Sequence, residues 1–204
     1  MLFNDSFNTI EKKAEGIFRD RGSKFIGHAF PVTTENEIKD ILVQLKKEHP
    51  SANHFCYAYR LGADKQNFRA NDDGEPSGSA GKPILGQLQS KDLTNVLLVV
   101  VRYFGGTLLG VPGLINAYKQ AAIEALQVVP IIEKHIQYPY QTSFSFERMN
   151  DVMRMLKEND AKIINQEFTE NCKIEFQIKK KDAEKLEQQF SKFFDLKLKA
   201  LKSN

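Results

Sequence analysis

Cysteine is scarce in this sequence, which has only Cys56 and Cys172 among its 204 residues and no CxxC or histidine-cluster spacing around either. This argues against a disulfide framework and a structural zinc site, and it is typical of a reducing cytoplasm. No apolar run approaches the roughly 20 residues that a membrane span requires. The N-terminal stretch also lacks the basic and apolar regions of a secretion signal. We therefore expect a cytoplasmic protein without a membrane partner.

A strong charge of one sign is also missing, because 29 basic residues stand against 26 acidic ones and the net charge is +3. Dividing the chain at Tyr138 leaves both parts close to neutral. Composition alone therefore gives no argument for nucleic-acid binding, and any RNA binding is expected to be weak and sharply salt-sensitive. The length and the 41% hydrophobic content fit one large domain or two small ones.

After Tyr138 the hydrophobic pattern predicts the order strand, helix, strand, strand, helix, strand. Phe144 and Phe146 are expected on one face of the first strand, and the first helix ends at Asn159. A short polar turn over residues 169–171 joins the two middle strands. This order is that of a ferredoxin-like βαββαβ domain, which we assign to residues 138–204. The expected inward side chains of the two helices are Met149, Val152, Met153, Leu156, Ala183, Leu186, Phe190 and either Phe193 or Phe194.

The preceding residues 1–137 mix strands and helices as well, so the whole chain is predicted to be α+β. A hairpin turns at residues 20–23, and an amphipathic helix begins after Thr33 or Thr34 and ends before Pro50. Residues 54–62 form a strand, and a nearly continuous apolar strand over residues 95–104 is expected at the centre of a sheet. A helix with small alanine side chains follows over residues 113–129.

Two glycine-rich connections interrupt this first part. One extends from Asn71 to Gly86, and the other joins the apolar strand to the following helix through Gly105, Gly106, Gly110 and Gly113. At a strand-to-helix turn, backbone N–H groups gather and attract anions such as phosphate or an acidic group of a partner. The glycines equally fit tight turns and close packing alone, and both interpretations remain open here.

The first connection contains three carboxylates, at Asp72, Asp73 and Glu75, but it is no P-loop. Gly81 and Lys82 are followed by Pro83, so the hydroxyl that holds Mg²⁺ is missing. The acids suit a divalent cation, yet the EF-hand spacing is absent, and we favour an acidic turn with Asx-type capping. No metal or cofactor is therefore predicted.

Three further residues carry possible chemistry. His54 and Cys56 share one face of a strand, where a thiolate–imidazole pair is conceivable, but a buried thiol beside a hydrogen-bonded histidine is favoured. Arg102 ends the buried strand, and a buried arginine requires an anionic partner. We predict that it pairs with Asp72, Asp73 or Glu75 and so joins the two connections into one surface.

Four stretches together, residues 52–62, 71–85, 99–110 and 113–118, resemble the YigZ/IMPACT family, and the likeness covers about residues 15–130. The resemblance implies a first domain like domain 2 of ribosomal protein S5 and a second like domain V of elongation factor G. Eukaryotic members resemble translational regulators that act by protein binding. Many members carry a lysine in the second connection and an arginine shortly after it, whereas this chain has Leu108 and Asn116 at these positions. Phosphate binding at this turn would therefore depend on Arg102, Lys119 and backbone N–H groups.

These observations predict a non-enzymatic regulatory protein of the translation apparatus that contacts the ribosome, RNA or a translation-regulating protein. The alternative is a small-molecule or phosphate-ester enzyme that uses Asp72, Asp73 or Glu75. No catalytic residue is assigned, and His54 and Cys56 form a possible minor site. The predicted binding residues are Asp72, Asp73, Gly74, Glu75, Pro76, Ser77, Gly78, Ser79, Lys82, Arg102, Tyr103, Phe104, Gly105 and Gly106.

Overall fold

The computed structural model describes residues 5–169 and 171–201, and within them the chain divides into two compact units. The first is Phe7–Lys134, and the second comprises residues 135–201 together with residues 5–6. A two-stranded sheet of β1 (Ser6–Ile10) and β7 (Ile131–His135) lies where the chain passes between them. Both units mix helices with sheets, which confirms the α+β class.

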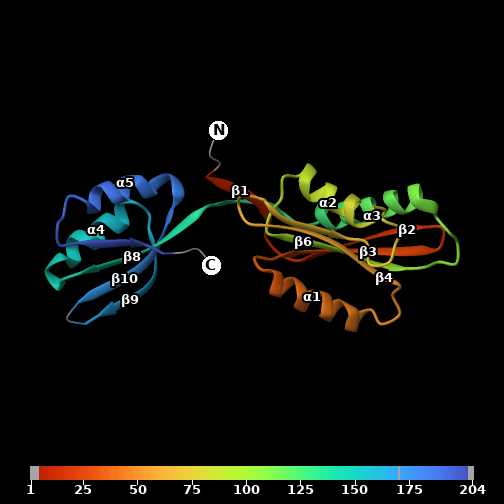
Figure 1. The fold of residues 1–204 in the computed structure, drawn as a ribbon, viewed down its shortest axis with the longest axis horizontal. Helices are drawn as coiled ribbons and strands as arrows, with labels where there is room; N and C mark the ends of the chain where they lie inside the picture. Colours follow the sequence, from red (N-terminus) through yellow and green to blue (C-terminus); the bar gives the residue numbers. More distant parts are fainter. Residues whose placement is uncertain (1–4, 170, 202–204) are drawn as a thin grey trace. The chain divides into compact units, whose positions relative to one another are not determined.

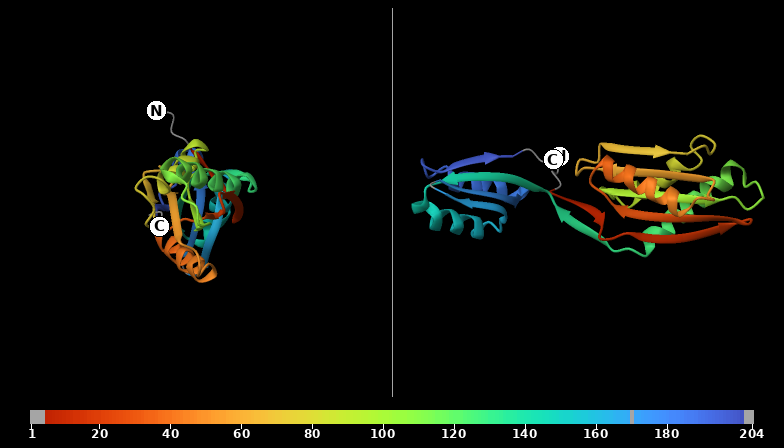
Figure 2. Two further views of the ribbon diagram at one scale, coloured as in Figure 1. Left: turned by 90° about the vertical axis from the view of Figure 1, so that its right-hand side faces the viewer. Right: turned by 90° about the horizontal axis from the view of Figure 1, so that it is seen from below.

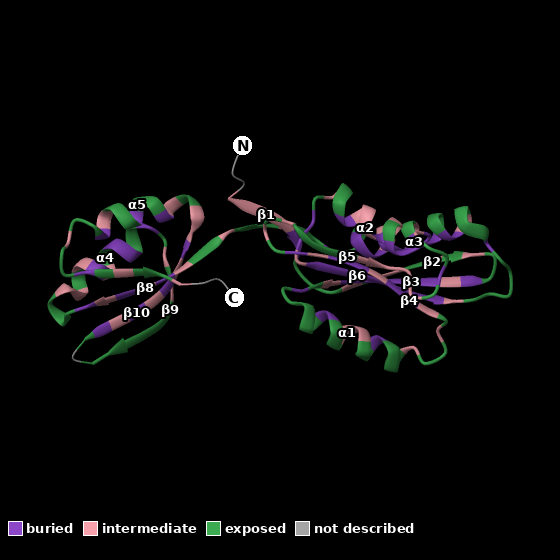
Figure 3. Cartoon of the chain, in the orientation of Figure 1, coloured by how far each residue is buried: buried purple, intermediate pink, exposed green. Residues whose placement is uncertain are grey.

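The first unit is built on an antiparallel five-stranded sheet with the strand order β2-β3-β6-β4-β5. As predicted, residues 20–23 close the hairpin between the first two strands, and β6 is central and buried on both faces (Figure 3). Its apolar run over residues 96–101 explains this place, because such a strand needs cover on each side. The strands are β2 (Ala14–Asp20), β3 (Ser23–Pro31), β4 (His54–Leu61), β5 (Asn67–Asn71) and β6 (Val96–Tyr103).

Helices cover both faces of this sheet (Figure 1). α1 (Glu35–Glu48) packs on one face, and it begins at Thr34, whose hydroxyl accepts a hydrogen bond from the Glu37 N–H. Seen from below in Figure 2, α1 lies in front of the strands. The opposite face carries α2 (Gly81–Ser90) and α3 (Gly110–Gln127), with Ile84 and Tyr118 among the buried side chains.

Four elements were not predicted, and two of them, β1 and β7, form the two-stranded sheet. Strand β5 precedes the acidic connection, and α2 begins at Gly81, inside the segment that was expected to remain a loop as far as Gly86. A helix that begins Gly-Lys-Pro has weak intrinsic propensity, but proline is tolerated in the first turn because its missing N–H would have no intrahelical partner there. The glycine-rich loop therefore ends at Ala80.

The second unit follows the predicted order of elements, with β8 (Gln137–Phe144), α4 (Met149–Glu158), β9 (Lys162–Phe168), β10 (Cys172–Lys179), α5 (Lys180–Phe190) and β11 (Lys197–Ala200). Its sheet has the order β11-β8-β10-β9, and both helices pack on one face (Figure 1). The predicted turn at residues 169–171 includes residue 170, which lies outside the described residues.

Several predicted inward side chains of the second unit lie in its core, including Val152, Leu156, Ala183, Leu186 and Phe190. One expectation was wrong. Phe146 does not share a face with Phe144, because β8 ends at Phe144 and Phe146 opens a short 3-10 helix (Phe146–Arg148), where it is exposed. Of the two final phenylalanines, Phe193 packs against the core, whereas Phe194 is fully exposed. No helix among the described residues has the length and hydrophobicity that a membrane span needs.

Candidate functional site

Asp72 organises the acidic loop between β5 and α2. Its carboxylate accepts three backbone hydrogen bonds, from the N–H groups of Gly78 at 2.8 Å, Ala80 at 3.0 Å and Gly81 at 2.8 Å. Burial alone raises the pKa of Asp72, but the three N–H groups, with the charge of Lys82, outweigh it and hold the pKa below its usual range. Asp72 thus accepts hydrogen bonds from the N–H groups at the start of α2. It caps the helix although it belongs to the preceding loop.

Asp73 fastens the same loop to strand β4. Its carboxylate accepts the Phe55 N–H at 2.6 Å, and its carbonyl oxygen lies 2.8 Å from Nδ1 of His54. Its backbone has φ of 42°, and Gly74 follows with φ of 88°. Since left-handed conformations are costly for residues other than glycine, these long-range bonds hold Asp73 in a turn it would not adopt alone.

Glu75 completes the predicted pairing with Arg102. The Arg102 Nη1 donates to Glu75 Oε1 at 2.5 Å, and the exposed fractions of the two side chains are only 7% and 4%. The Tyr118 hydroxyl donates to the same oxygen at 2.6 Å, and burial raises the tyrosine's pKa well above its usual range. The Arg102 guanidinium also lies between the rings of Phe25 and Phe104, at 5.4 and 5.6 Å. One acid of the first loop therefore joins β6 and α3 through a buried ion pair.

A pocket of about 470 Å³ opens beside this pair. The buried side chains of Glu75 and Arg102 give it a polar floor, beside the more exposed Asn53 and His54, and His54 Nε2 lies 3.8 Å from Glu75 Oε1. The rim is apolar and exposed, most strongly at Leu108, whose exposed fraction is 82%. The apolar residues that line the pocket are Pro76, Phe104, Leu108, Leu109, Val111 and Leu114. The site therefore combines a fixed polar floor with an apolar edge that lacks cover.

Two side chains from other parts of the first unit accept hydrogen bonds from the second glycine-rich connection and hold it in place. The Phe104 N–H donates to Asn53 Oδ1 at 2.9 Å, and the Gly105 N–H donates to Ser23 Oγ at 3.1 Å. A Cβ on Gly105 would lie 1.9 Å from the carbonyl carbon of Gly22, so glycine is required for this close approach. Two of the N–H groups that were considered for anion binding are thus already paired. Tyr103 points elsewhere, since its hydroxyl lies 2.8 Å from Nδ1 of His49.

Some of the remaining predicted residues stabilise the acidic loop, and others are exposed on the surface. Ser79 is buried, and its hydroxyl donates to the Pro76 carbonyl at 2.6 Å. Ser77, Lys82 and Gly106 are exposed. Tyr118 and the apolar rim at Leu108 and Val111 were not predicted as site residues. The signal in the sequence for the role of Tyr118 was a hydroxyl placed on an otherwise apolar helix face.

His54 and Cys56 do not form a nucleophilic pair. His54 bonds to the Asp73 carbonyl, and the Cys56 thiol, which is fully buried, donates to the Asp72 carbonyl at 3.0 Å. Burial raises the pKa of Cys56 to about 12, and the charges of Glu75 and Asp73 act in the same direction. The thiol therefore stays protonated at neutral pH, as the favoured prediction had it. Among the described residues, no group of three or more histidine, cysteine, aspartate or glutamate side chains is arranged to hold a metal.

Cys56 is accordingly expected to resist alkylation. In the native protein at pH 8, its reaction with iodoacetamide should be at least about a hundredfold slower than that of an exposed thiol, because only the thiolate reacts and little is present. Mass spectrometry of peptides after timed quenching measures the rate, with urea-unfolded protein as the reference. Fast native labelling of Cys56 at pH 8 would contradict the assigned burial and hydrogen bond.

Comparisons with known proteins add a family context. A family model described as the Impact N-terminal domain matches residues 21–126. The chain is 34% identical over 177 residues to the IMPACT family member YvyE of Bacillus subtilis. The aligned residues make up 87% of this chain and 82% of that protein. It is 37% identical over 132 residues to the IMPACT family member YigZ of Escherichia coli, over 64% of this chain and 65% of that protein.

A solved structure also resembles the whole chain. It is titled as the crystal structure of a hypothetical protein, is 28% identical, and covers 98% of this chain and 99% of its own with a TM-score of 0.75. The similarity therefore extends over both units and is not confined to the matched N-terminal residues.

Proposed function

Because the chain belongs to the IMPACT family, we propose that it is a non-enzymatic regulatory protein of the translation apparatus. It binds its partner through the face formed by the acidic loop, residues 72–82, and the second connection, residues 102–106, together with the apolar rim at Leu108 and Val111. We call this the loop face. The family membership supports the regulatory role, since the resemblance implies that eukaryotic members are similar to translational regulators that act by protein binding.

The observation that carries this proposal is the exposed apolar rim above a buried polar floor. Phe104, Leu108 and Val111 expose 45%, 82% and 47% of their surface beside the Glu75–Arg102 pair. Protein interfaces typically place apolar anchors around a small set of oriented polar groups, and such centres dominate the binding energy. The loop face therefore suits an apolar side chain of a partner with a hydrogen-bonding group next to it.

The acids of this face are committed to structural bonds, which favours binding over catalysis. Asp72 and Asp73 accept backbone N–H groups, and Glu75 accepts from Arg102 and Tyr118. A general base or metal ligand needs a free lone pair directed at its target. The alternative remains a small-molecule or phosphate-ester enzyme. It is favoured by the pocket volume of about 470 Å³, which lies within the range of ligand sites.

Contact with RNA or the ribosome is supported by a second surface, on the sheet face of the second unit that α4 and α5 leave open. Along β10 the residues Cys172, Ile174, Phe176 and Ile178 point to the helices, so the alternate residues face outward. Two outward glutamates, Glu167 and Glu175, are outnumbered there by lysines. The outward lysines are Lys162, Lys173, Lys179, Lys197 and Lys199. This excess of positive charge suits a phosphate backbone.

We also propose the finer architecture that the family resemblance implies. The first domain, residues 1–137, resembles domain 2 of ribosomal protein S5. The second, residues 138–204, is ferredoxin-like and resembles domain V of elongation factor G. The strand order β11-β8-β10-β9 with two helices on one face supports the second assignment. Both likenesses are to components of the translation apparatus, so we propose a cytoplasmic protein.

Co-sedimentation with purified ribosomes at low and moderate salt tests the proposed function. We expect saturable binding, weakened at least about tenfold by the double substitution Phe104→Asp with Leu108→Asp, because the rim would lose its apolar contact. The control is Val43→Asp, which places one aspartate on an exposed apolar position of α1. Each variant's melting temperature should remain within a few degrees of the parent protein's.

A second variant separates the two surfaces in the same experiment. Replacing Lys173, Lys197 and Lys199 together by glutamine should weaken binding mainly at low salt and reduce its dependence on salt concentration. Absence of ribosome binding by the parent protein at both salt concentrations rejects the translation proposal. A thermal-shift screen of metabolites and nucleotides then tests the enzyme alternative at the pocket of the loop face.

A further inference from the structure

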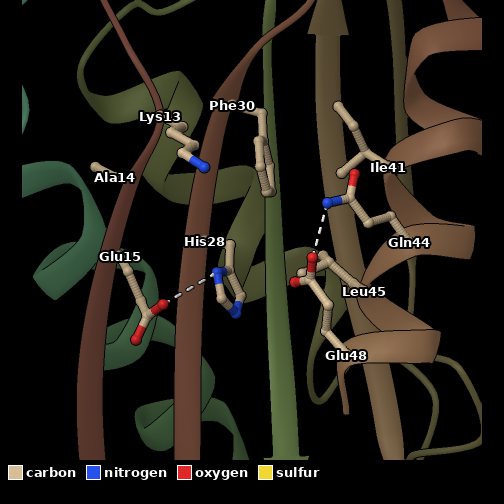
Figure 4. Close-up of a pocket in the computed structure, with 9 residues that line it drawn as sticks. All are labelled: Lys13, Ala14, Glu15, His28, Phe30, Ile41, Gln44, Leu45 and Glu48. Carbon is tan, nitrogen blue, oxygen red and sulfur yellow. Dashed lines mark hydrogen bonds and ion pairs between the residues drawn. The ribbon is translucent and has the colours of Figure 1, made fainter. Parts of the chain in front are cut away.

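The first unit has a second pocket, on the face of the sheet opposite the loop face. It has a volume of about 330 Å³ and lies between α1 and the outer strands β2 and β3 (Figure 4). α1 packs over β3, β6 and β4, but no residue of β2 belongs to the core on this side. Because α1 does not cover β2, a groove remains between the helix and this strand, and Glu15 of β2 lines it.

His28 lies at the centre of this pocket, and its side chain is 8% exposed. Its Nδ1 faces Glu15 Oε2 at 3.7 Å, which favours the tautomer with the proton on Nδ1. Burial lowers the pKa of His28, opposed by Glu15 and Glu48 and assisted by His49, so the ring is neutral at pH 7. The other nitrogen, Nε2, is then an acceptor, and it has no hydrogen-bond partner. A buried acceptor without a donor is unfavourable, and a ligand N–H would satisfy it.

The pocket has an excess of negative charge. Glu15 comes from β2 and Glu48 from α1, and Figure 4 shows the two carboxyl groups on opposite sides of His28. Gln44 Nε2 donates to Glu48 Oε1 at 2.7 Å and so orients that carboxylate. With His28 neutral, Lys13 is the single cation among the lining residues. The two carboxylates and the neutral imidazole nitrogen are all hydrogen-bond acceptors, so the pocket suits a ligand that donates hydrogen bonds.

The remaining wall is apolar and flat. The Phe30 ring is stacked with His28, with centroids 6.1 Å apart and an interplanar angle of 19°. Ile41 and Leu45 of α1 line the other side. Planar cations are attracted to aromatic faces and pair with carboxylates in the same plane, so the geometry suits a guanidinium or amidinium group better than a bulky ammonium ion.

We propose that this pocket binds a small organic cation of the guanidinium or amidinium type. The ligand donates N–H groups to Glu48 and to the Nε2 of His28, and its planar group lies against Phe30, while Glu15 on the other side of the ring adds negative charge. The volume of about 330 Å³ is near the lower end for ligand sites, which limits the ligand to a compact molecule. The site is separate from the loop face and does not depend on the proposed function.

Benzamidine is a suitable probe, and benzamide is its neutral control of almost the same shape. Titration of the full chain at pH 7.5, followed by the NMR signals of the His28 ring, should show saturable binding of benzamidine. Benzamide should bind at least about tenfold more weakly, since it lacks the charge-assisted hydrogen bonds. A His28→Gln variant assigns the ring signals.

Substitutions locate the site and provide its control. Glu48→Gln should weaken benzamidine binding about tenfold, whereas Asp40→Asn removes an acid from an exposed position of α1 outside the pocket and should leave binding unchanged. Glu15→Gln serves as a second variant, because its side chain is 55% exposed and its loss is tolerated by the fold. Lowering the pH until His28 takes up a proton should also weaken binding.

Three results would overturn the proposal. They are no shift of the His28 signals at millimolar benzamidine, equal affinity for benzamidine and benzamide, or equal effects of Glu48→Gln and Asp40→Asn. Ribosome binding is measured separately at the loop face, so failure of either proposal leaves the other intact.

Discussion

Gly27→Ala is expected to destabilise the first unit by about 3 kcal/mol or more. The added methyl group would clash with backbone atoms of α3, which cannot move without shifting the helix. Gly27 of β3 lies directly opposite Gly16 of β2, and α3 rests on this glycine pair. A Cβ on Gly27 would lie 2.1 Å from the carbonyl oxygen of Ala121, and one on Gly16 would lie 2.3 Å from the carbonyl carbon of Glu124. Helix backbone atoms cannot rotate aside, so the whole helix must shift.

Urea unfolding followed by circular dichroism measures this effect, and hydrogen exchange of β6 amides identifies the transition of the first unit. The matched control is Gly86→Ala in α2, where an added Cβ would have no atom within 4 Å. That change should be neutral or stabilising by up to about 1 kcal/mol, because alanine is the better helix former. Equal effects of the two substitutions would show that α3 does not depend on the glycine pair.

Glu75→Ala is expected to cost about 3–5 kcal/mol of stability, because it leaves the Arg102 charge buried without its partner. Arg102 and Glu75 expose only 7% and 4% of their side chains, so solvent cannot replace the lost carboxylate. The Tyr118 hydroxyl loses its acceptor in the same variant. The change in the free energy of unfolding is again measured with urea.

The double substitution Glu75→Leu with Arg102→Met distinguishes a buried charge from a general packing defect. Replacing both partners by apolar side chains removes the unpaired charge, and stability should return to within about 1–2 kcal/mol of the parent protein. Loss of ribosome binding in this folded variant would then assign the pair a part in recognition. A Glu75→Ala change below about 1 kcal/mol would mean that the pair contributes little.

The sequence resemblance to the YigZ/IMPACT family is confirmed by the comparisons, and most elements followed from local patterns. The apolar run over residues 96–101 predicted a central strand, and the buried position of Arg102 predicted an acidic partner in the first loop. The start of α2 escaped prediction, because Gly81 and Pro83 are weak helix formers that gain stability from Asp72 and the surrounding core.

By itself the sequence determined two mixed units, the central strand and the need for a carboxylate beside Arg102. Only the tertiary structure decided which of three neighbouring acids meets that need. The left-handed turn at Asp73 and Gly74 directs Asp72 to the first N–H groups of α2 and Asp73 to β4, which leaves Glu75 for Arg102 and Tyr118. The directions of Asp73 and Glu75 depend on contacts between residues 18 to 43 positions apart, and no local pattern encodes them.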